Sequence, residues 1–387
     1  MPDPISSNAT EWSLLLSACS ATLCPERTGA ISPRLQKPIQ WPVLVALADR
    51  HGVSSLFNQA LQTFQDQVPA DQIHVLADRY QSNIHKSLFL ARELIRILDC
   101  FDSRSLEVMP YKGVTLAETM YGDMALRHSG DIDLLIRPTD VKRAQAALHD
   151  LGYTPQLSLS PQQENAYLSS GYECAFDSDR GRNLLELQWA LQPRFYAVDV
   201  AMDELFKRAV FATVAGRRMK TLSPEDMMLV LSVHAAKHVW GRLIWLCDIA
   251  QVIRRSKLDW NWIETRAGEL GVLRIVQITL LLAHQLLKAD LPAPVTKNLS
   301  SDPATVALAD EIHTQVAAGT SLDVESFAYF SLMIRLRERR ADKMRFVHRL
   351  AFTPGPNEWQ AIQLPPLLFP LYRLVRVARL TARFARV

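Results

Sequence analysis

The chain has few cysteines, and they are scattered. Five cysteines among 387 residues form no Cys-x-x-Cys pair and no cluster with histidine; they are Cys19, Cys24, Cys100, Cys174 and Cys247. This spacing does not indicate a metal site built on thiolates. An odd, scattered set of thiols is what a reducing compartment permits.

Long apolar runs are also missing. No stretch of about 18 uncharged apolar residues is present, so no transmembrane helix is predicted. The sequence starts Met-Pro-Asp-Pro and has no basic segment before the apolar residues 14–16, so we do not expect a secretory signal. The net charge of +3 is too small to indicate a nucleic-acid partner by itself. These features together predict a cytoplasmic protein.

The composition is that of an ordinary globular protein, with 48% hydrophobic and 21% charged residues. Its length allows two or three domains. Helical patterns fill residues 1–105, a mixture of strands and helices fills 106–222, and helical patterns return over 223–387. The sequence therefore predicts an α+β protein, in which a small mixed-sheet core is flanked by an N-terminal helical region and a C-terminal helical domain.

Hydrophobic periodicity and turn residues locate the expected elements. Helices are predicted over 41–50, 53–64, 71–103, 114–121, 138–151, 227–240, 244–256, 260–270, 272–289, 303–317 and 324–350. Strands are predicted over 106–111 and 131–136, with hairpins formed by 172–176 and 184–189 and by 210–214 and 217–221. Ser223, followed by proline and two acids, marks the start of the last helical part.

Residues 130–136, Gly-Asp-Ile-Asp-Leu-Leu-Ile, place two carboxylates two positions apart in an apolar run. Residues i and i+2 of a strand share a face, so Asp131 and Asp133 should lie side by side while Ile132 and Leu134 pack into a core. Adjacent carboxylates are costly to bury without a cation. Oxygen ligands at this spacing suit Mg²⁺ or Mn²⁺ rather than Zn²⁺. The plain alternative is a strand end with two exposed acids.

The residues around this strand resemble a known family. The resemblance is carried, in order, by Tyr-Lys-Gly-Val-Thr-Leu-Ala-Glu at 111–118, Tyr121, Arg127, the Asp-x-Asp strand, Leu-Gly-Tyr at 151–153, Leu-Glu-Leu-Gln-Trp at 185–189 and the block at 234–250 that begins His-Ala-Ala-Lys-His-Val-Trp. Over roughly residues 40–290 the chain resembles the uncharacterised nucleotidyltransferases of the polymerase-β-like superfamily.

The resemblance implies an enzyme that moves a nucleoside monophosphate from an NTP, with ATP the expected nucleotide, to an acceptor. This chemistry needs the triphosphate charge neutralised, which two metal ions held by three carboxylates achieve. Asp131 and Asp133 supply two carboxylates. Glu186, between two leucines on an expected neighbouring strand, is the predicted third and could help deprotonate the acceptor. Asp177 and Asp179 are rivals in an expected loop, and a surface acid is the plain alternative for Glu186.

Lys112 and Gly113 form an expected turn between a strand and a helix. Glycine allows close approach to the backbone, a helix N-terminus favours anions and lysine adds charge, so this turn is predicted to bind phosphate. The wider superfamily usually has Gly-Ser here, whereas Val114 follows Gly113 in this chain and Thr115 would have to take the place of the serine. A tight turn with a solvated lysine is the alternative. Arg127 could clamp a phosphate or neutralise the nearby acids.

Three basic residues, His234, Lys237 and His238, are spaced to share one helix face, and Arg242 and Asp248 follow. The histidine spacing matches a zinc-binding pair, but the glutamate of His-Glu-x-x-His is missing. We predict a cleft wall in which Lys237, His238 and Arg242 contact the nucleotide or the acceptor. The alternative is a polar network that docks the helical domain through Asp248.

The last segment, 364–387, predicts a basic amphipathic helix. Its arginines recur at spacings of three and four; they are Arg373, Arg376, Arg379, Arg383 and Arg386. Residues 365–387 could therefore contact an anionic membrane surface or an acidic partner. Alternatively, the helix could pack on the body of the protein with its arginine face in solvent.

The sequence as a whole predicts a magnesium- or manganese-dependent nucleotidyltransferase that binds an NTP and releases pyrophosphate. The acceptor is left open between a small molecule, a protein side chain and an RNA end. The rival interpretation is a non-catalytic module that binds a nucleotide or a partner on the same fold.

Overall fold

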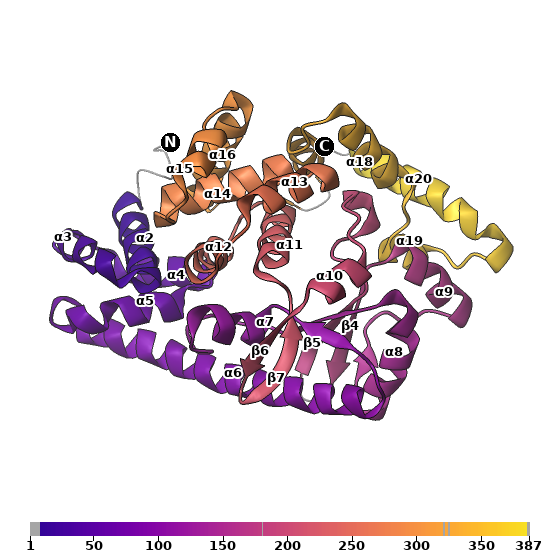
Figure 1. Ribbon diagram of the computed structural model, residues 1–387, viewed down its shortest axis with the longest axis horizontal. Coiled ribbons are helices and arrows are strands. Elements are labelled where there is room, and N and C mark those ends of the chain that lie inside the picture. The colour runs from indigo at the N-terminus through magenta and orange to yellow at the C-terminus, as the bar shows by residue number, and fades with distance from the viewer. Residues whose placement is uncertain (1–7, 180, 320–321, 324–325, 385–387) are drawn as a thin grey trace.

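A computed structural model describes residues 8–179, 181–319, 322–323 and 326–384 (Figure 1). It confirms the α+β class, because a five-stranded mixed sheet lies between helical regions. The strands of this sheet are β1 (Val108–Pro110), β2 (Ile132–Ile136), β3 (Thr154–Pro155), β4 (Glu173–Ser178) and β5 (Gly181–Gln188). A separate antiparallel pair consists of β6 (Val210–Val214) and β7 (Arg217–Thr221).

The strand order is β1-β2-β5-β4-β3, and only the central pair, β2 and β5, is parallel. The β4–β5 hairpin was predicted, but most of its expected loop is strand, because pairing continues past an irregularity near Phe176 to Ser178 and Gly181. The register sets Asp133 opposite Glu186 and Glu173 opposite Gln188. These four side chains therefore share one face of the sheet.

The N-terminal part forms α2 (Ala9–Leu23), η1 (Pro25–Ala30), α3 (Ser32–Leu35), α4 (Trp41–Arg50), α5 (Ser54–Leu61), η2 (Gln62–Gln67) and α6 (Ala70–Ser103). The predicted helix over 53–64 ends early, at Leu61, and continues as a kinked 3₁₀ segment in which Phe64 leaves helical geometry. Helix α6 is continuous over 34 residues and runs along one face of the sheet (Figure 1).

Around the sheet lie α7 (Gly113–Leu116), the π-helical turn η3 (Ala117–Tyr121), η4 (Pro138–Asp140), α8 (Val141–Asp150), α9 (Pro161–Ser170), η5 (Arg194–Tyr196) and α10 (Met202–Arg208). Alternation along β2 divides the core in two. Ile132 and Leu134 enter a core, as predicted, and share it with α6 and α8, while Leu135 on the opposite face joins the core formed by the N-terminal and C-terminal helices. The face that carries Asp133 is therefore turned toward the C-terminal helices.

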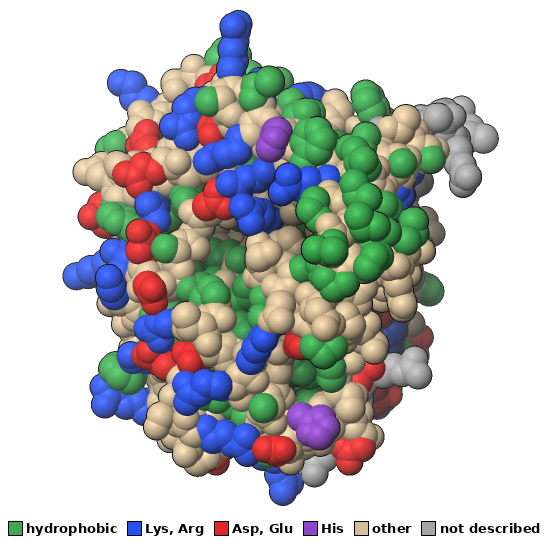
Figure 2. Space-filling view, turned by 90° about the vertical axis from the view of Figure 1, so that its right-hand side faces the viewer, with side chains coloured by type: hydrophobic (Ala, Val, Ile, Leu, Met, Phe, Trp, Pro, Cys, Tyr) green, Lys and Arg blue, Asp and Glu red, His purple; other side chains and the backbone are tan. Residues whose placement is uncertain are grey.

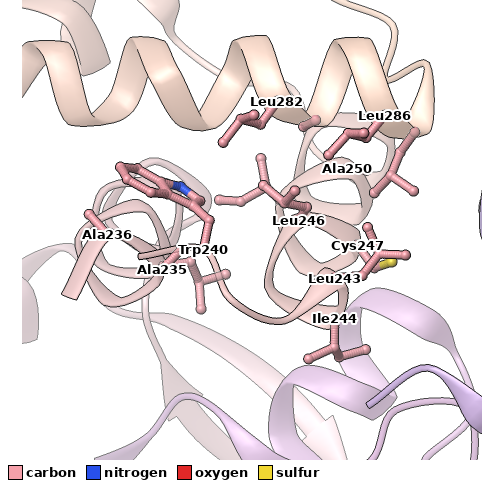
Figure 3. Packing of buried hydrophobic residues seen from close by; sticks show 14 of the residues in the cluster. Ala235, Ala236, Trp240, Leu243, Ile244, Leu246, Cys247, Ala250, Leu282 and Leu286 are labelled. Carbon is pink, nitrogen blue, oxygen red and sulfur yellow. The ribbon is translucent and has the colours of Figure 1, made fainter. Parts of the chain in front are cut away.

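Those helices are α11 (Pro224–Lys237), α12 (Leu243–Arg255), α13 (Trp260–Leu270), α14 (Leu273–Leu287), α15 (Ala293–Leu299) and α16 (Pro303–Ala318). The predicted cap is present, because Ser223 Oγ accepts from the Asp226 backbone N–H at 3.2 Å. Trp240, fully buried between α11, α12 and α14, donates from Nε1 to Thr279 Oγ1 at 2.9 Å (Figure 3). Figure 3 shows its ring beside Leu246 and Leu282, so it is a core residue.

The predicted helix over 324–350 is wrong: two helices, α17 (Phe327–Arg335) and α18 (Arg340–Phe352), occupy the described part, and residues 324–325 lie outside it. The chain breaks where buried Arg337 donates to the backbone oxygens of Gly271 (3.0 Å) and Tyr196 (2.7 Å). These contacts hold the segment between α17 and α18 against η5 and the end of α13.

The C-terminal segment forms α19 (Pro356–Ala361), η6 (Pro366–Leu371) and α20 (Tyr372–Phe384). The expected tail helix thus starts later than predicted, and residues 385–387 lie outside the described part. The helix packs on the body of the protein, as the alternative above states, because Tyr372 and Leu380 are buried in the cores. Its arginine face lies only partly in solvent: Arg373 is exposed, whereas Arg376 and Arg379 both contact the carboxylate of Glu358, which is 0% exposed. A buried acid thus draws these two arginines inward. No helix within the described ranges is long and apolar enough to cross a bilayer.

Candidate active site

Four carboxylates gather on the sheet face that the C-terminal helices cover. Asp131 lies directly before β2, Asp133 lies within it, Glu186 lies opposite Asp133 on β5, and Glu173 lies on β4. Asp133 is only 5% exposed, and the other three are partly buried. The structure thus brings the three predicted acids together and adds Glu173, which the sequence analysis missed.

Burial and repulsion make two of these acids, Asp131 and Glu186, hard to ionise. Burial, and then the charge of Asp133, raises the pKa of Asp131 to about 6. Burial, followed by the charges of Glu173 and Asp133, raises the pKa of Glu186 to about 8. Both shifts have the sign expected where negative charges outnumber the positive groups that compensate them.

Gln188 separates three of the acids. Its amide nitrogen Nε2 lies 2.9 Å from Glu186 Oε2, 3.3 Å from Glu173 Oε2 and 3.4 Å from Asp133 Oδ1. The buried Tyr111 hydroxyl donates to Gln188 Oε1 at 2.7 Å and so fixes the amide with its NH₂ group toward the carboxylates. The Glu-x-Gln spacing on β5 indicates that Glu186 and Gln188 share a face of the sheet. It does not predict the contact with Glu173, which depends on the register between β4 and β5.

The Lys112–Gly113 turn lies against the acids. Lys112 Nζ is 3.3 Å from Asp133 Oδ1 and 4.9 Å from the centroid of the Tyr111 ring. Burial opposes the charged form of Lys112, but the attraction of Asp133 holds its pKa above the ordinary value. Gly113 has φ +55°, and a Cβ there would lie 2.9 Å from the Asp131 carbonyl oxygen. Glycine therefore permits the close approach that brings the lysine to the acid face.

Lys237, at the end of α11, faces the same site from the helical side. Its Nζ lies 3.1 Å from the Tyr172 hydroxyl, and Tyr172 precedes Glu173 on β4. Burial lowers the pKa of Lys237, although the charge of Glu173 opposes that shift. The structure thus brings Lys237 to the acids, as the cleft-wall prediction requires.

The other residues of the predicted cleft wall, His234, His238 and Arg242, lie within five positions of Lys237 in the sequence. The rings of His234 and His238 are 4.9 Å apart, and both pack on Trp245, at 5.4 Å and 5.2 Å. Burial, and then the charge of Lys237, lowers the pKa of His238 to about 3, so its imidazole is neutral at neutral pH. Arg242 is exposed at the start of α12. A ligand-binding role for His238 and Arg242 stays a prediction.

Arg127 is engaged elsewhere. It donates from Nε and Nη2 to the two carboxylate oxygens of Asp248, at 2.8 Å and 2.9 Å, and Asp248 is 0% exposed. Burial opposes the charged guanidinium, but Asp248 holds its pKa above the ordinary value. The docking network through Asp248, considered above as an alternative, is therefore present for Arg127. A phosphate-binding role for Arg127 stays a prediction.

The acid face has the oxygen-only donor set that hard divalent cations prefer. Among the residues that the structure describes, no three His, Cys, Asp or Glu side chains converge as a set of metal ligands. The Gln188 amide lies where three of these carboxylates would otherwise approach one another. By charge and donor type, the carboxylates fit Mg²⁺ or Mn²⁺. The Gln188 amide would have to move aside before three of them could bind one ion.

Comparison with known proteins gives the family of the chain. A family model described as uncharacterised nucleotidyltransferase matches residues 37–288, which is more than half of the chain. The matched range includes the Lys112–Gly113 turn, all four acids and the helix that carries Lys237. No curated protein and no solved structure matches the chain. The chain belongs to the family of uncharacterised nucleotidyltransferases.

Proposed function

We propose that this nucleotidyltransferase uses Mg²⁺ or Mn²⁺, held by Asp131, Asp133 and Glu186, to transfer a nucleoside monophosphate from an NTP to an acceptor. The main support is the strand register, which sets Asp133 opposite Glu186 with Asp131 two residues before it. Burial raises the pKa of Asp131 and of Glu186, the latter to about 8. A divalent cation is the partner that such an excess of buried negative charge favours.

The balanced reaction defines what the side chains must do. A bond forms between the acceptor oxygen or nitrogen and the α-phosphorus, and the bond from that phosphorus to the bridging oxygen breaks, so that pyrophosphate leaves. When bound, the metal supplies charge neutralisation on the triphosphate and orients the leaving group. We assign to Glu186 the task of taking the proton that the acceptor loses. The family suggests an NTP as the substrate, and ATP is the nucleotide that we expect.

Two lysines are placed to hold the triphosphate. Lys112 contacts Asp133 across the acid face, and Lys237 reaches the same region from α11 through its contact with Tyr172. Lys112 comes from the turn before α7 and Lys237 from the end of α11, so the two ammonium groups come from different elements. When an anionic substrate binds, Lys112 would exchange its contact with Asp133, and Lys237 its contact with Tyr172, for contacts with phosphate oxygens, which are strong hydrogen-bond acceptors.

A transfer assay tests the proposal. The protein is incubated with each α-labelled NTP, with Mg²⁺ or Mn²⁺ and with a pool of small metabolites, proteins or RNA, and label attached to any acceptor is measured. Metal-dependent labelling that the Asp133→Asn variant lacks would support the proposal. Equal labelling by both proteins would remove Asp133 from the mechanism.

A second candidate is a module that binds a nucleotide without turning it over. The position of the Gln188 amide among Asp133, Glu173 and Glu186 favours it, because an amide that stays there would keep the acids apart. Calorimetry that detects NTP binding, together with no labelled product from any acceptor pool, would favour this candidate.

A further inference from the structure

Exposed apolar side chains concentrate in one part of the chain. Within the described residues, eight of the twelve large hydrophobic side chains that are exposed lie between positions 344 and 374; they are Met344, Val347, Phe352, Ile362, Leu367, Leu368, Leu371 and Leu374. On the face that includes α9 and α20, Figure 2 shows hydrophobic side chains gathered in a patch, with Lys and Arg side chains beside it. Contiguous exposed apolar surface on this scale indicates an interaction site.

We name five of these residues, Ile362, Leu367, Leu368, Leu371 and Leu374, the leucine ridge. The ridge projects from the protein, since the Leu367 side chain is 94% exposed and that of Leu374 is 62% exposed. Four of its residues belong to η6 and the first turn of α20.

The ridge is held on a folded base. Tyr372, fully buried, donates from its hydroxyl to the Ile362 carbonyl at 2.7 Å and accepts from the Leu364 N–H at 3.1 Å. Its ring lies 4.2 Å from that of Trp359. On the inner side of α20, Arg376 is bound to buried Glu358. Because these contacts fix the inner face of the segment, the leucines are presented outward by the fold itself.

The surroundings of the ridge are strongly basic. Residues 340–387 contain nine Lys and Arg against two acids, a net charge of +7, whereas the whole chain carries only +3. A pocket of about 760 Å³ adjoins the ridge, and its lining includes Arg194, His348, Arg349 and Arg373 together with Phe352 and Phe369. Arg349 is paired with Asp199, while Arg373 is exposed. Apolar and cationic groups thus share one surface.

We propose that the leucine ridge and the adjoining basic pocket dock this protein on the surface of a bilayer that contains anionic phospholipids. The leucines would enter the boundary between headgroups and acyl chains, and the pocket would take headgroup phosphates. The proposal does not depend on nucleotidyl transfer.

The shape and charge of this surface favour a bilayer over a bound peptide or a second copy of the chain. A groove-binding peptide needs a concave apolar site, whereas Leu367 projects almost fully into solvent. A two-fold dimer through the ridge would bring two segments of charge +7 against each other, which like-charge repulsion opposes. An anionic bilayer supplies both the apolar depth and the opposite charge.

Vesicle co-sedimentation of the full chain tests the proposal. One set of vesicles contains phosphatidylcholine alone, and the other contains phosphatidylcholine mixed equally with phosphatidylglycerol. The protein should sediment with the mixed vesicles and not with phosphatidylcholine alone, and added salt should weaken binding. Leu367→Asp and Leu374→Asp should each reduce partitioning at least about tenfold, as expected when a buried leucine is lost. Arg373→Glu should also reduce it.

The matched control is Leu88→Asp, because Leu88 is 55% exposed on α6, outside the ridge. Its partitioning should equal that of the wild type, and thermal melting should show all variants folded. Failure to bind mixed vesicles, equal binding to both vesicle types, or unchanged binding by the Leu367→Asp variant would overturn the proposal. So would self-association in sedimentation velocity that Leu367→Asp abolishes, because the occupant would then be a second copy of the chain.

Discussion

Arg127 and Asp248 form a buried bidentate ion pair that joins the loop before β2 to α12, with donor–acceptor distances of 2.8 Å and 2.9 Å. The Tyr121 hydroxyl donates to the same carboxylate at 2.7 Å. The residues are 121 positions apart in the chain. This contact fixes the start of the Asp-x-Asp strand relative to the helices that cover it, so its main effect should be on the stability of that arrangement.

Replacing Arg127 with methionine should lower the free energy of unfolding by about 3–5 kcal/mol, because it leaves the Asp248 carboxylate buried without its cation. Urea denaturation measures the change. The control is Arg104→Met, which breaks the exposed pair with Asp150 and should cost less than about 1 kcal/mol. Equal losses for the two variants would contradict a special role for the buried pair.

Replacing Lys237 with alanine should reduce NTP turnover much more than it reduces the melting temperature. The variant loses a charged donor that faces the acids. Burial lowers the pKa of Lys237, which shows that keeping this side chain charged lowers the stability of the folded state. Turnover and thermal melting are measured on the same preparations, with exposed Lys257→Ala as control. Full activity with a large drop in melting temperature would assign Lys237 to packing alone.

Replacing Lys112 with alanine should weaken NTP binding by about 1–3 kcal/mol, the range for a lost hydrogen bond to a charged group. Calorimetry in the presence of Mg²⁺ measures the affinity. Lys142→Ala is the control, because Lys142 is exposed on α8 and contacts Asn165 rather than the acids. If the Lys112 variant binds NTP as tightly as the wild type, the turn at Lys112–Gly113 has no phosphate role.

His51 should make stability depend on pH. It is fully buried, its Nδ1 accepts from the Leu243 N–H at 3.2 Å, and burial lowers its pKa to about 4. In the unfolded chain the pKa of the histidine is about 6.5, so below that pH the unfolded state binds a proton that the folded state does not bind. The free energy of unfolding is therefore not reduced by His51 above about pH 6.5. Between that pH and about pH 4 it falls by up to about 3 kcal/mol.

The measurement compares wild type with His51→Gln, whose side chain does not titrate, in urea unfolding at about pH 7 and about pH 4.5. The wild type should lose more stability than the variant over this interval. Parallel curves for the two proteins would show that His51 does not cause the loss.

The strand with the paired acids was predictable because alternation along 131–136 is a local property. Ile132 and Leu134 enter one core, and Asp133 points to the other face, as the period of two requires. Glu186 was found because it too interrupts an apolar strand. The roles of Glu173 and Gln188 were missed because they depend on the register between β4 and β5, which the turn does not reveal.

Contacts between residues far apart in the sequence explain the other differences between the prediction and the structure. The inward turn of Arg376 depends on Glu358, which lies 18 residues away on α19, and the engagement of Arg127 depends on Asp248. Helical spacing places the arginines of the tail on one face correctly. Whether that face meets solvent or a buried acid is set by tertiary packing, which the spacing does not encode.

Substitution of Asp131 and Asp133 should separate catalysis from folding. Asp131→Asn and Asp133→Asn should each abolish metal-dependent NTP turnover. Neither should unfold the protein, because each removes like-charge repulsion that raises the pKa of a neighbouring acid. Thermal melting without added metal should give a temperature equal to or above that of the wild type for Asp131→Asn. Asp133→Asn also loses the contact with Lys112, so it should melt cooperatively as a folded protein at a slightly lower temperature. A large drop would show that these carboxylates serve the fold.

The most direct test is transfer of label from α-labelled ATP to an acceptor pool, with pyrophosphate measured alongside, by wild type and by Asp133→Asn. We expect wild type to produce both in equal amounts with Mg²⁺ or Mn²⁺ and neither with a chelator. The Asp133→Asn variant should stay at background although it is folded. Equal product from the two proteins, or product that persists in the chelator, would contradict metal-dependent nucleotidyl transfer at Asp131, Asp133 and Glu186.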